Sequence, residues 1–113
     1  MPLPELQLRD VEKHLDAYCN TVPEHARCQL RMGYVIKGNT VILYEERPLF
    51  RDKAQWRAFE VAQFRYIRTV DRWRLFYKDQ HSKWHIYGGV EDAERFEDLL
   101  KEVVEDPTCI FWG

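Results

Sequence analysis

A stretch with two-residue periodicity constrains the fold more than any other feature of the sequence. Apolar and polar side chains alternate through residues 28–36, as they do in a β-strand that buries one face. A Gly-Asn pair at residues 38–39 is typical of a two-residue hairpin turn, and residues 40–46 continue as the return strand. The register that this turn fixes places Arg31 opposite Glu46, a favourable cross-strand pair of opposite charge. The sequence therefore predicts a β-hairpin here.

Two stretches with helical periodicity lie near the ends of the chain. Residues 4–19 carry an apolar stripe that includes Val11 and Leu15. Residues 91–105 carry a longer stripe, which includes Ala93 and Phe96. Both stripes predict amphipathic helices whose apolar faces pack against other elements.

The segment between the hairpin and the second helix predicts three further strands, at residues 61–68, 73–78 and 83–87. We expect residues 48–59 to connect them to the hairpin, with one helical turn over residues 54–57. The predicted fold is α+β, with the order α-β-β-β-β-β-α and both helices on one face of a curved antiparallel sheet of about five strands. In the alternative arrangement, the helices lie at one end and the sheet curls toward a partial barrel.

The size and hydropathy of the chain suggest where it resides. A length of 113 residues suits a single domain that spans residues 1–113. No apolar run reaches the roughly 18 residues that a membrane-spanning helix needs. Residues 1–9 do not have the apolar core of a signal peptide. We therefore expect a cytoplasmic protein with no membrane partner.

The residue types that most often hold metals are poorly spaced for that role. Cys19, Cys28 and Cys109 show no C-x-x-C spacing. His81 and His85 fall on a predicted turn and a predicted strand, where four residues span about 13 Å, too far for two ligands of one ion. We expect no metal and no cofactor.

Charge is divided unevenly along the chain. Residues 47–87 hold ten basic and four acidic side chains, whereas residues 88–113 hold two basic and eight acidic ones. Residues 1–46 are nearly balanced, with five basic and seven acidic side chains. The basic segment either neutralises the acidic one within the fold or presents a basic surface to an anionic partner.

Pairing the last three predicted strands as a meander gathers basic and aromatic side chains on one face. That face is predicted to carry Arg65, Arg74, Phe76, Lys78, Lys83, His85 and Tyr87. Trp84 and Ile86 are predicted to lie on the opposite, helix-covered face. Cations that bind phosphates and rings that stack on bases are how proteins hold single-stranded nucleic acid. In the alternative interpretation, this is an ordinary solvated sheet face, or the C-terminal tail covers Phe76 and Tyr87.

Glu45 is the one carboxylate that the predicted hairpin places on its apolar face. A carboxylate in such a setting can act as an acid or a base, and Arg47 lies beside it, so the two residues mark a candidate pocket. The alternative is that the strand reaches the rim of the domain there and Glu45 meets water or an arginine. The sequence contains no motif that commits it to a reaction, so we assign no catalytic residue and favour a protein that is not an enzyme.

The C-terminal tail is unusually apolar. Ile110, Phe111 and Trp112 are expected to dock either on the domain or on a second copy, which makes them a candidate homodimer interface.

Several runs of the sequence are similar to those of a known family. They include Leu30-Arg31-Met32-Gly33-Tyr34, Tyr44-Glu45-Glu46-Arg47-Pro48, Ala62-Gln63-Phe64-Arg65-Tyr66 and the ending Ile110-Phe111-Trp112-Gly113. On these residues the chain resembles a bacterial family of small, uncharacterised proteins described only as a domain of unknown function, some of whose members are carried on integron cassettes. The resemblance implies a bacterial origin and a stand-alone protein, and it implies no activity.

Three functional hypotheses follow. The first is a non-catalytic binding or interaction module, with a homodimer as one form of it. The second is a single-stranded nucleic-acid or anion binder that uses the basic-aromatic face. The third is a small-ligand pocket or enzyme around Glu45 and Arg47.

Overall fold

The computed structural model describes residues 3–21, 30–49, 51–52, 54–87, 93–106 and 110–111. The predicted start of the first strand at residue 28, the predicted start of the second helix at residue 91, and Trp112 of the tail lie outside the described residues.

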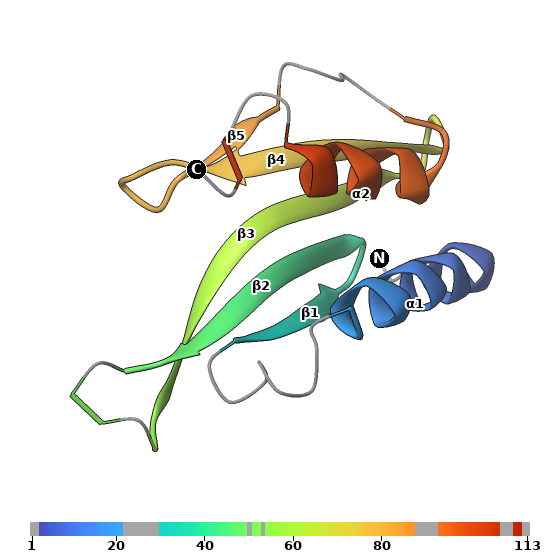
Figure 1. Cartoon of the computed structure of the whole chain (residues 1–113). Coiled ribbons are helices and arrows are strands. Elements are labelled where there is room, and N and C mark those ends of the chain that lie inside the picture. The colour runs from blue at the N-terminus through green and yellow to red at the C-terminus, as the bar shows by residue number, and fades with distance from the viewer. Residues whose placement is uncertain are drawn as a thin grey trace.

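The chain forms one antiparallel sheet with a helix before it and a helix after it (Figure 1). The elements are α1 (Glu5–Cys19), β1 (Arg31–Lys37), β2 (Thr40–Pro48), β3 (Trp56–Ile67), β4 (Arg72–Lys78), β5 (Trp84–Ile86) and α2 (Phe96–Glu105). The five strands follow one another in the sheet in the order β1-β2-β3-β4-β5. The predicted α+β class and element order are confirmed.

The first hairpin has the predicted register. Lys37 pairs with Thr40 across the turn, and Arg31 pairs with Glu46. Gly38, the first of the two turn residues, has a φ of 58°. Glycine adopts this conformation at little cost because it has no Cβ atom, which explains its place here.

The connection between the second and third strands differs from the prediction. β3 begins at Trp56, which pairs with Pro48, so the helical turn predicted over residues 54–57 is wrong. The Arg31 guanidinium of β1 lies 3.7 Å from the centre of the Trp56 ring of β3, a contact that reaches across β2 and stabilises this end of the sheet. As a result, the β2–β3 hairpin extends well beyond the body of the domain, at the lower left of Figure 1.

A β-bulge interrupts β3. Leu43 pairs with Ala62 but its neighbour Tyr44 pairs with Glu60, so Val61 is an extra residue in the longer strand. Such an insertion interrupts the regular alternation, so side chains before and after it point to different faces of the sheet from those that an unbroken strand would give. Because of the bulge, Glu60 lies on the same face of the sheet as Gln63.

Both helices pack on one face of the sheet, and the core lies between the two layers. Val11 and Leu15 of α1 are fully buried there. Phe96 of α2 meets the rings of Phe64 and Trp73, with ring centres 4.7 Å and 5.1 Å apart. Edge-on contacts at these distances are favourable, so α2 is anchored on β3 and β4. Neither helix is long and apolar enough to cross a membrane within the part of the chain that the structure describes.

The second helix begins later than predicted. Ala93, which was predicted to lie on the helical stripe, instead exchanges two backbone hydrogen bonds with Trp73 in an isolated β-bridge. These bonds satisfy backbone groups that would otherwise be buried without partners. The helical periodicity of the sequence therefore predicts a start of α2 that is too early in the chain.

The last strand is shifted by one residue from its predicted register. Phe76 pairs with Ile86 and Lys78 pairs with Trp84, so Trp84 and Ile86 lie on the face away from the helices. The predicted assignment of these two residues to the helix-covered face is wrong. Tyr87 donates its backbone N–H to Leu75 and is only 1% exposed, so it lies on the helix-covered side instead. A one-residue slip exchanges the two faces of a strand.

Candidate binding surface on the open sheet face

Among the residues that the structure describes, no helix covers one face of the sheet, and we call it the open face. The alternation of side chains along the paired strands assigns residues to it. Its large side chains are Arg31, Val35, Lys37, Ile42, Tyr44, Glu46, Trp56, Glu60, Gln63, Arg65, Ile67, Arg72, Arg74, Phe76, Lys78, Trp84 and Ile86.

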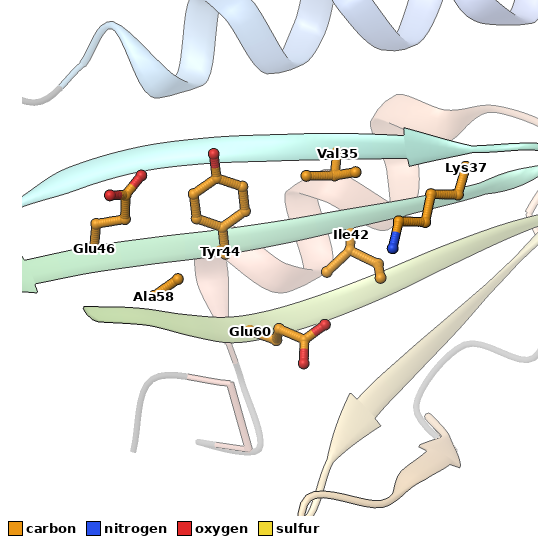
Figure 2. A pocket seen from close by; sticks show the side chains of 7 residues that line it. All are labelled: Val35, Lys37, Ile42, Tyr44, Glu46, Ala58 and Glu60. Atoms are coloured by element: carbon orange, nitrogen blue, oxygen red, sulfur yellow. The ribbon is translucent and has the colours of Figure 1, made fainter. Parts of the chain in front are cut away.

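A shallow hollow of about 380 Å³ lies on this face over β1, β2 and β3. It is lined by Val35, Lys37, Ile42, Tyr44, Glu46, Ala58 and Glu60 (Figure 2). Aliphatic side chains form part of its lining, while one lysine and two carboxylates bring charge to it. Figure 2 shows Tyr44 between Glu46 on one side and Ile42 on the other. The hollow combines an apolar surface with hydrogen-bonding groups, as small-ligand sites do.

The bulge in β3 supplies one of the two carboxylates. With regular alternation, Glu60 would share a face with Ala62, on the helix-covered side of the sheet. The extra residue Val61 places it opposite Tyr44 on the open face instead. Bulges re-aim side chains in this way beside functional sites in many proteins.

Tyr44 is held in the hollow by a glycine on the neighbouring strand. Gly33 pairs with Tyr44, and a Cβ atom at Gly33 would lie 2.6 Å from the tyrosine ring. Burial raises the pKa of the Tyr44 hydroxyl, and the nearby Glu46 carboxylate raises it further. The hydroxyl is therefore neutral at physiological pH and able to donate a hydrogen bond.

The two carboxylates of the hollow have different surroundings. Glu60 accepts a charge-assisted hydrogen bond from Lys78, whose ammonium also lies 5.4 Å from the centre of the Trp84 ring. Glu46 has no ion-pair or hydrogen-bond partner among the side chains that the structure describes. Glu60 is therefore fixed by an existing partner, whereas Glu46 keeps its acceptor capacity for another group.

Arginine and lysine lie against aromatic rings on both sides of the hollow. Arg31 covers Trp56 beyond Glu46, and Lys78, which pairs with Glu60, approaches Trp84 on the two strands beside the hollow. The Arg65 guanidinium lies 4.7 Å from the centre of the Phe76 ring. These cation–π contacts orient both the cations and the rings on the open face.

Four of the residues predicted for the basic-aromatic face do lie together. Arg65 and Arg74 pair directly across β3 and β4, and Phe76 and Lys78 lie on the same face. Phe76 is only 9% exposed, and the Arg65 guanidinium covers its ring. A base could stack on this ring only after Arg65 moved aside.

The other three predicted residues lie elsewhere. Lys83 is in the turn before β5, where its backbone N–H donates to the Asp79 carboxylate. His85 is on the other face, where its ring stacks on Tyr77 and its Nε2 lies 2.6 Å from Asp79 Oδ2. Tyr87 is buried, and its hydroxyl donates to Glu102 over 2.8 Å. The predicted register that grouped His85 and Tyr87 with Phe76 is wrong, because β5 is displaced by one residue.

Asp79 organises the β4–β5 turn. Its carboxylate accepts hydrogen bonds from the backbone N–H of Lys83 and of His81, and it faces the His85 ring. The bond from Lys83, followed by that with His85, lowers the pKa of Asp79 to about 2. The carboxylate is therefore charged under ordinary conditions and fixes the geometry of the turn.

Glu45 and Arg47, the predicted pocket residues, contact each other. The Glu45 side chain is 17% exposed, and its Oε1 lies 3.4 Å from the Arg47 Nε. Glu45 pairs with Met32 and Phe59 on the face opposite the hollow, so its neighbour Glu46 lines the hollow and Glu45 does not. A site at Glu45 stays a prediction.

Part of the apolar tail docks on its own domain. The Phe111 ring packs against Tyr87 with centres 5.2 Å apart, and its backbone N–H donates to Asp106 Oδ1 over 3.1 Å. Ile110 is 40% exposed. A role of the tail in dimerisation stays a prediction. Within the described ranges, no group of three His, Cys, Asp or Glu side chains could hold a metal ion.

Sequence reasoning missed the hollow and the exposed aromatics. Val35, Ile42 and Tyr44 are apolar residues at positions that alternate with the core positions of the first hairpin. Apolar side chains at the solvent-facing positions of two neighbouring strands were the available signal for a binding surface, because a merely solvated face carries polar residues at those positions.

Comparison with known proteins places the chain in one family. A family model described as a domain of unknown function (DUF3024) matches residues 3–113. No curated protein matches the chain, and no solved structure matches it either.

Proposed function

The chain belongs to this family of domains of unknown function, and we propose that it is a non-catalytic binding protein whose open face takes single-stranded nucleic acid. The observation that carries the proposal is the separation of charge between the two layers of the fold. A basic, partly aromatic sheet face lies opposite an acidic helical layer.

The separation can be counted. The open face carries six basic and two acidic side chains, a net charge of +4. The two helices carry eight acidic and three basic side chains, a net charge of −5. The protein as a whole has a formal charge of only −2, so its composition hides this division. Such a field orients an anionic partner toward the sheet and away from the helices.

Exposed rings and aliphatic groups favour a partner that also has flat surfaces. Trp56 and Trp84 are partly exposed, and Ile86 is 55% exposed. Stacking a base on an aromatic side chain contributes about 1–3 kcal/mol. Single-stranded nucleic acid offers both phosphates for the cations and bases for the rings, whereas duplex DNA keeps its bases stacked inside.

A second copy of the chain is a less suitable occupant. In an isologous dimer through the open face, two surfaces of charge +4 would meet. Like charges brought together at an interface disfavour association. Self-association is therefore an alternative outcome of the test below. A cytoplasmic location, expected from the hydropathy of the sequence, is part of the proposal. The family resemblance adds a bacterial origin, with carriage on integron cassettes for some members.

The test is fluorescence anisotropy with labelled single-stranded DNA and RNA at low and physiological salt. We expect binding that weakens steeply with salt, and a smaller salt dependence in Arg65→Ala, by about one unit of logarithmic slope for each lost phosphate contact. Arg9→Ala on α1 is the matched control, because Arg9 is an exposed arginine paired with Glu5 on the helical layer. No binding at low salt would reject the proposal, and a dimer in light scattering would favour the second copy.

A further inference from the structure

We infer that the hollow over β1–β3 is a base-reading subsite that prefers a base with an exocyclic amino group, such as cytosine, over thymine or uracil. The inference rests on the proposed function and goes further, because it assigns sequence preference to one place on the open face.

Two carboxylates in a basic surface require an explanation. Glu46 and Glu60 are the acidic members of the open face, and both line the hollow. They repel phosphate, so a surface that held only the nucleic-acid backbone would not gain from them. Contacts to phosphate position a nucleic acid, whereas contacts to base edges carry the sequence preference. The hollow is therefore suited to a base and not to a phosphate.

The chemistry of a carboxylate selects among bases. An ionised carboxylate only accepts hydrogen bonds. The amino group of cytosine donates at the position where thymine presents a carbonyl oxygen. A carboxylate that faces this position binds cytosine and repels thymine. The two bases have similar size, so the preference comes from hydrogen bonding and not from fit.

Glu46 is the residue that we assign to base reading. Glu60 already accepts a hydrogen bond from Lys78, so it shapes the hollow as a positioning residue. The carboxylate of Glu46 has no such partner among the described side chains, and it lies beside the Tyr44 hydroxyl in Figure 2. Tyr44 is neutral and provides a second hydrogen-bonding group next to the carboxylate.

The remaining lining fits the rest of a nucleotide. Val35 and Ile42 offer an apolar surface against which the flat face of a base packs. Lys37 lies at the end of β1 and lines the same hollow, within reach of a phosphate beside the bound base. A volume of about 380 Å³ is near the lower end of the range of small-ligand sites, which suits a single base.

The test compares two labelled single-stranded DNA oligomers of equal length, one of thymidine alone and one with cytidine at its central positions. We expect the cytidine oligomer to bind the wild-type protein about five- to tenfold more tightly, as for a single discriminating base contact. Glu46→Gln should reduce this ratio to less than about twofold, because the amide presents a donor as well as an acceptor. Glu45→Gln is the matched control, since Glu45 is adjacent in sequence but lies on the other face.

The outcomes separate the inference from the proposed function. Salt-dependent binding with equal affinity for both oligomers would overturn the base-reading subsite and leave the proposed function in place. A cytidine preference that persists in Glu46→Gln would overturn the assignment to the hollow. No binding of either oligomer at low salt would overturn both. Circular dichroism of each variant establishes that its fold is intact.

Discussion

The ring of Tyr44 lies across Gly33 on the neighbouring strand, so closely that a Cβ atom at Gly33 would come within 2.6 Å of the ring. Glycine is unfavourable inside a strand, yet here its lack of a side chain makes room for the aromatic ring. An aromatic ring over a cross-strand glycine also shields the backbone that the glycine exposes. This contact sets the position of Tyr44 in the hollow.

Replacing Gly33 with alanine should therefore alter the hollow more than the stability. The tyrosine ring is half-buried and can swing aside, so we expect the free energy of unfolding to change by less than about 1 kcal/mol. Affinity for single-stranded DNA should fall, because the displaced tyrosine ring changes the shape of the hollow. Urea unfolding and anisotropy measure the two effects. Gly38→Ala is the control, since its positive φ predicts lost stability with little change in affinity.

Tyr34 connects the first helix to the sheet. Its hydroxyl donates a hydrogen bond of 2.6 Å to Asp16 Oδ1 of α1. Because the bond is largely exposed, Tyr34→Phe should lower the free energy of unfolding by only about 0.5 kcal/mol. An unchanged stability at neutral pH would contradict a stabilising role of this bond.

The same bond predicts a response to alkali. Burial, followed by the bond to Asp16, raises the pKa of Tyr34 above its ordinary value of 10.0. A raised folded-state pKa contributes stability that is present below the unfolded-state pKa and is lost as the pH rises above it. The wild-type protein should therefore lose stability above pH 10, and Tyr34→Phe should lose less. Parallel pH profiles of the two proteins would contradict this account.

Asp79 predicts a response to acid in the β4–β5 turn. Its pKa is lowered to about 2 from 3.8, so its contribution is present above the higher value and is lost as the pH falls toward the lower one. Asp79→Asn can keep an acceptor for the backbone N–H groups but carries no charge. We expect the melting temperature of the variant to depend less on pH between these two values than that of the wild type. Equal pH dependence would assign the acid response to other carboxylates.

Tyr87 and Trp84 distinguish the two faces at β5. Tyr87→Phe removes the hydrogen bond to Glu102 beneath α2 and should cost about 1 kcal/mol of stability without changing affinity for DNA. Trp84→Ala should lower the affinity for DNA with little change in stability, since Trp84 lies on the open face. If Tyr87→Phe had reduced affinity for DNA and Trp84→Ala had the affinity of the wild type, the register predicted from sequence would be the correct one.

The contrast between the first and last hairpins shows why prediction succeeded in one and failed in the other. In β1 and β2, a long alternation, a Gly-Asn turn and the opposite charges of the facing residues Arg31 and Glu46 agree on one register. β5 has only three residues, and the alternation of apolar Trp84 and Ile86 with polar His85 favours the opposite phase from the one that the structure has. Its register is fixed by contacts that the sequence does not reveal, among them the backbone hydrogen bond from Tyr87 to Leu75 and the one from Asp79 to Lys83 across the turn.

The place of Glu60 in the hollow could not be predicted because it depends on a bulge. The sequence shows no signal for the extra residue Val61, and without it Glu60 would lie on the helix-covered side. The basic residues Arg65, Arg74 and Lys78 were placed on the correct strands, but the aromatic partners differ. The open face carries Trp56 and Trp84 instead of the predicted Tyr87. Trp56 lies there because β3 begins earlier than predicted, and Trp84 lies there because β5 is shifted by one residue.

The most direct test of the open face as the binding surface is a nuclear magnetic resonance titration of the ¹⁵N-labelled protein with single-stranded DNA. The indole N–H signals provide internal probes on both sides of the sheet. Trp56 and Trp84 lie on the open face, whereas Trp73 is fully buried beneath the helices and donates its indole N–H to Gln7. We predict that the Trp56 and Trp84 signals shift and that the Trp73 signal does not. Shifts confined to α1 and α2, or no shifts at low salt, would contradict the account.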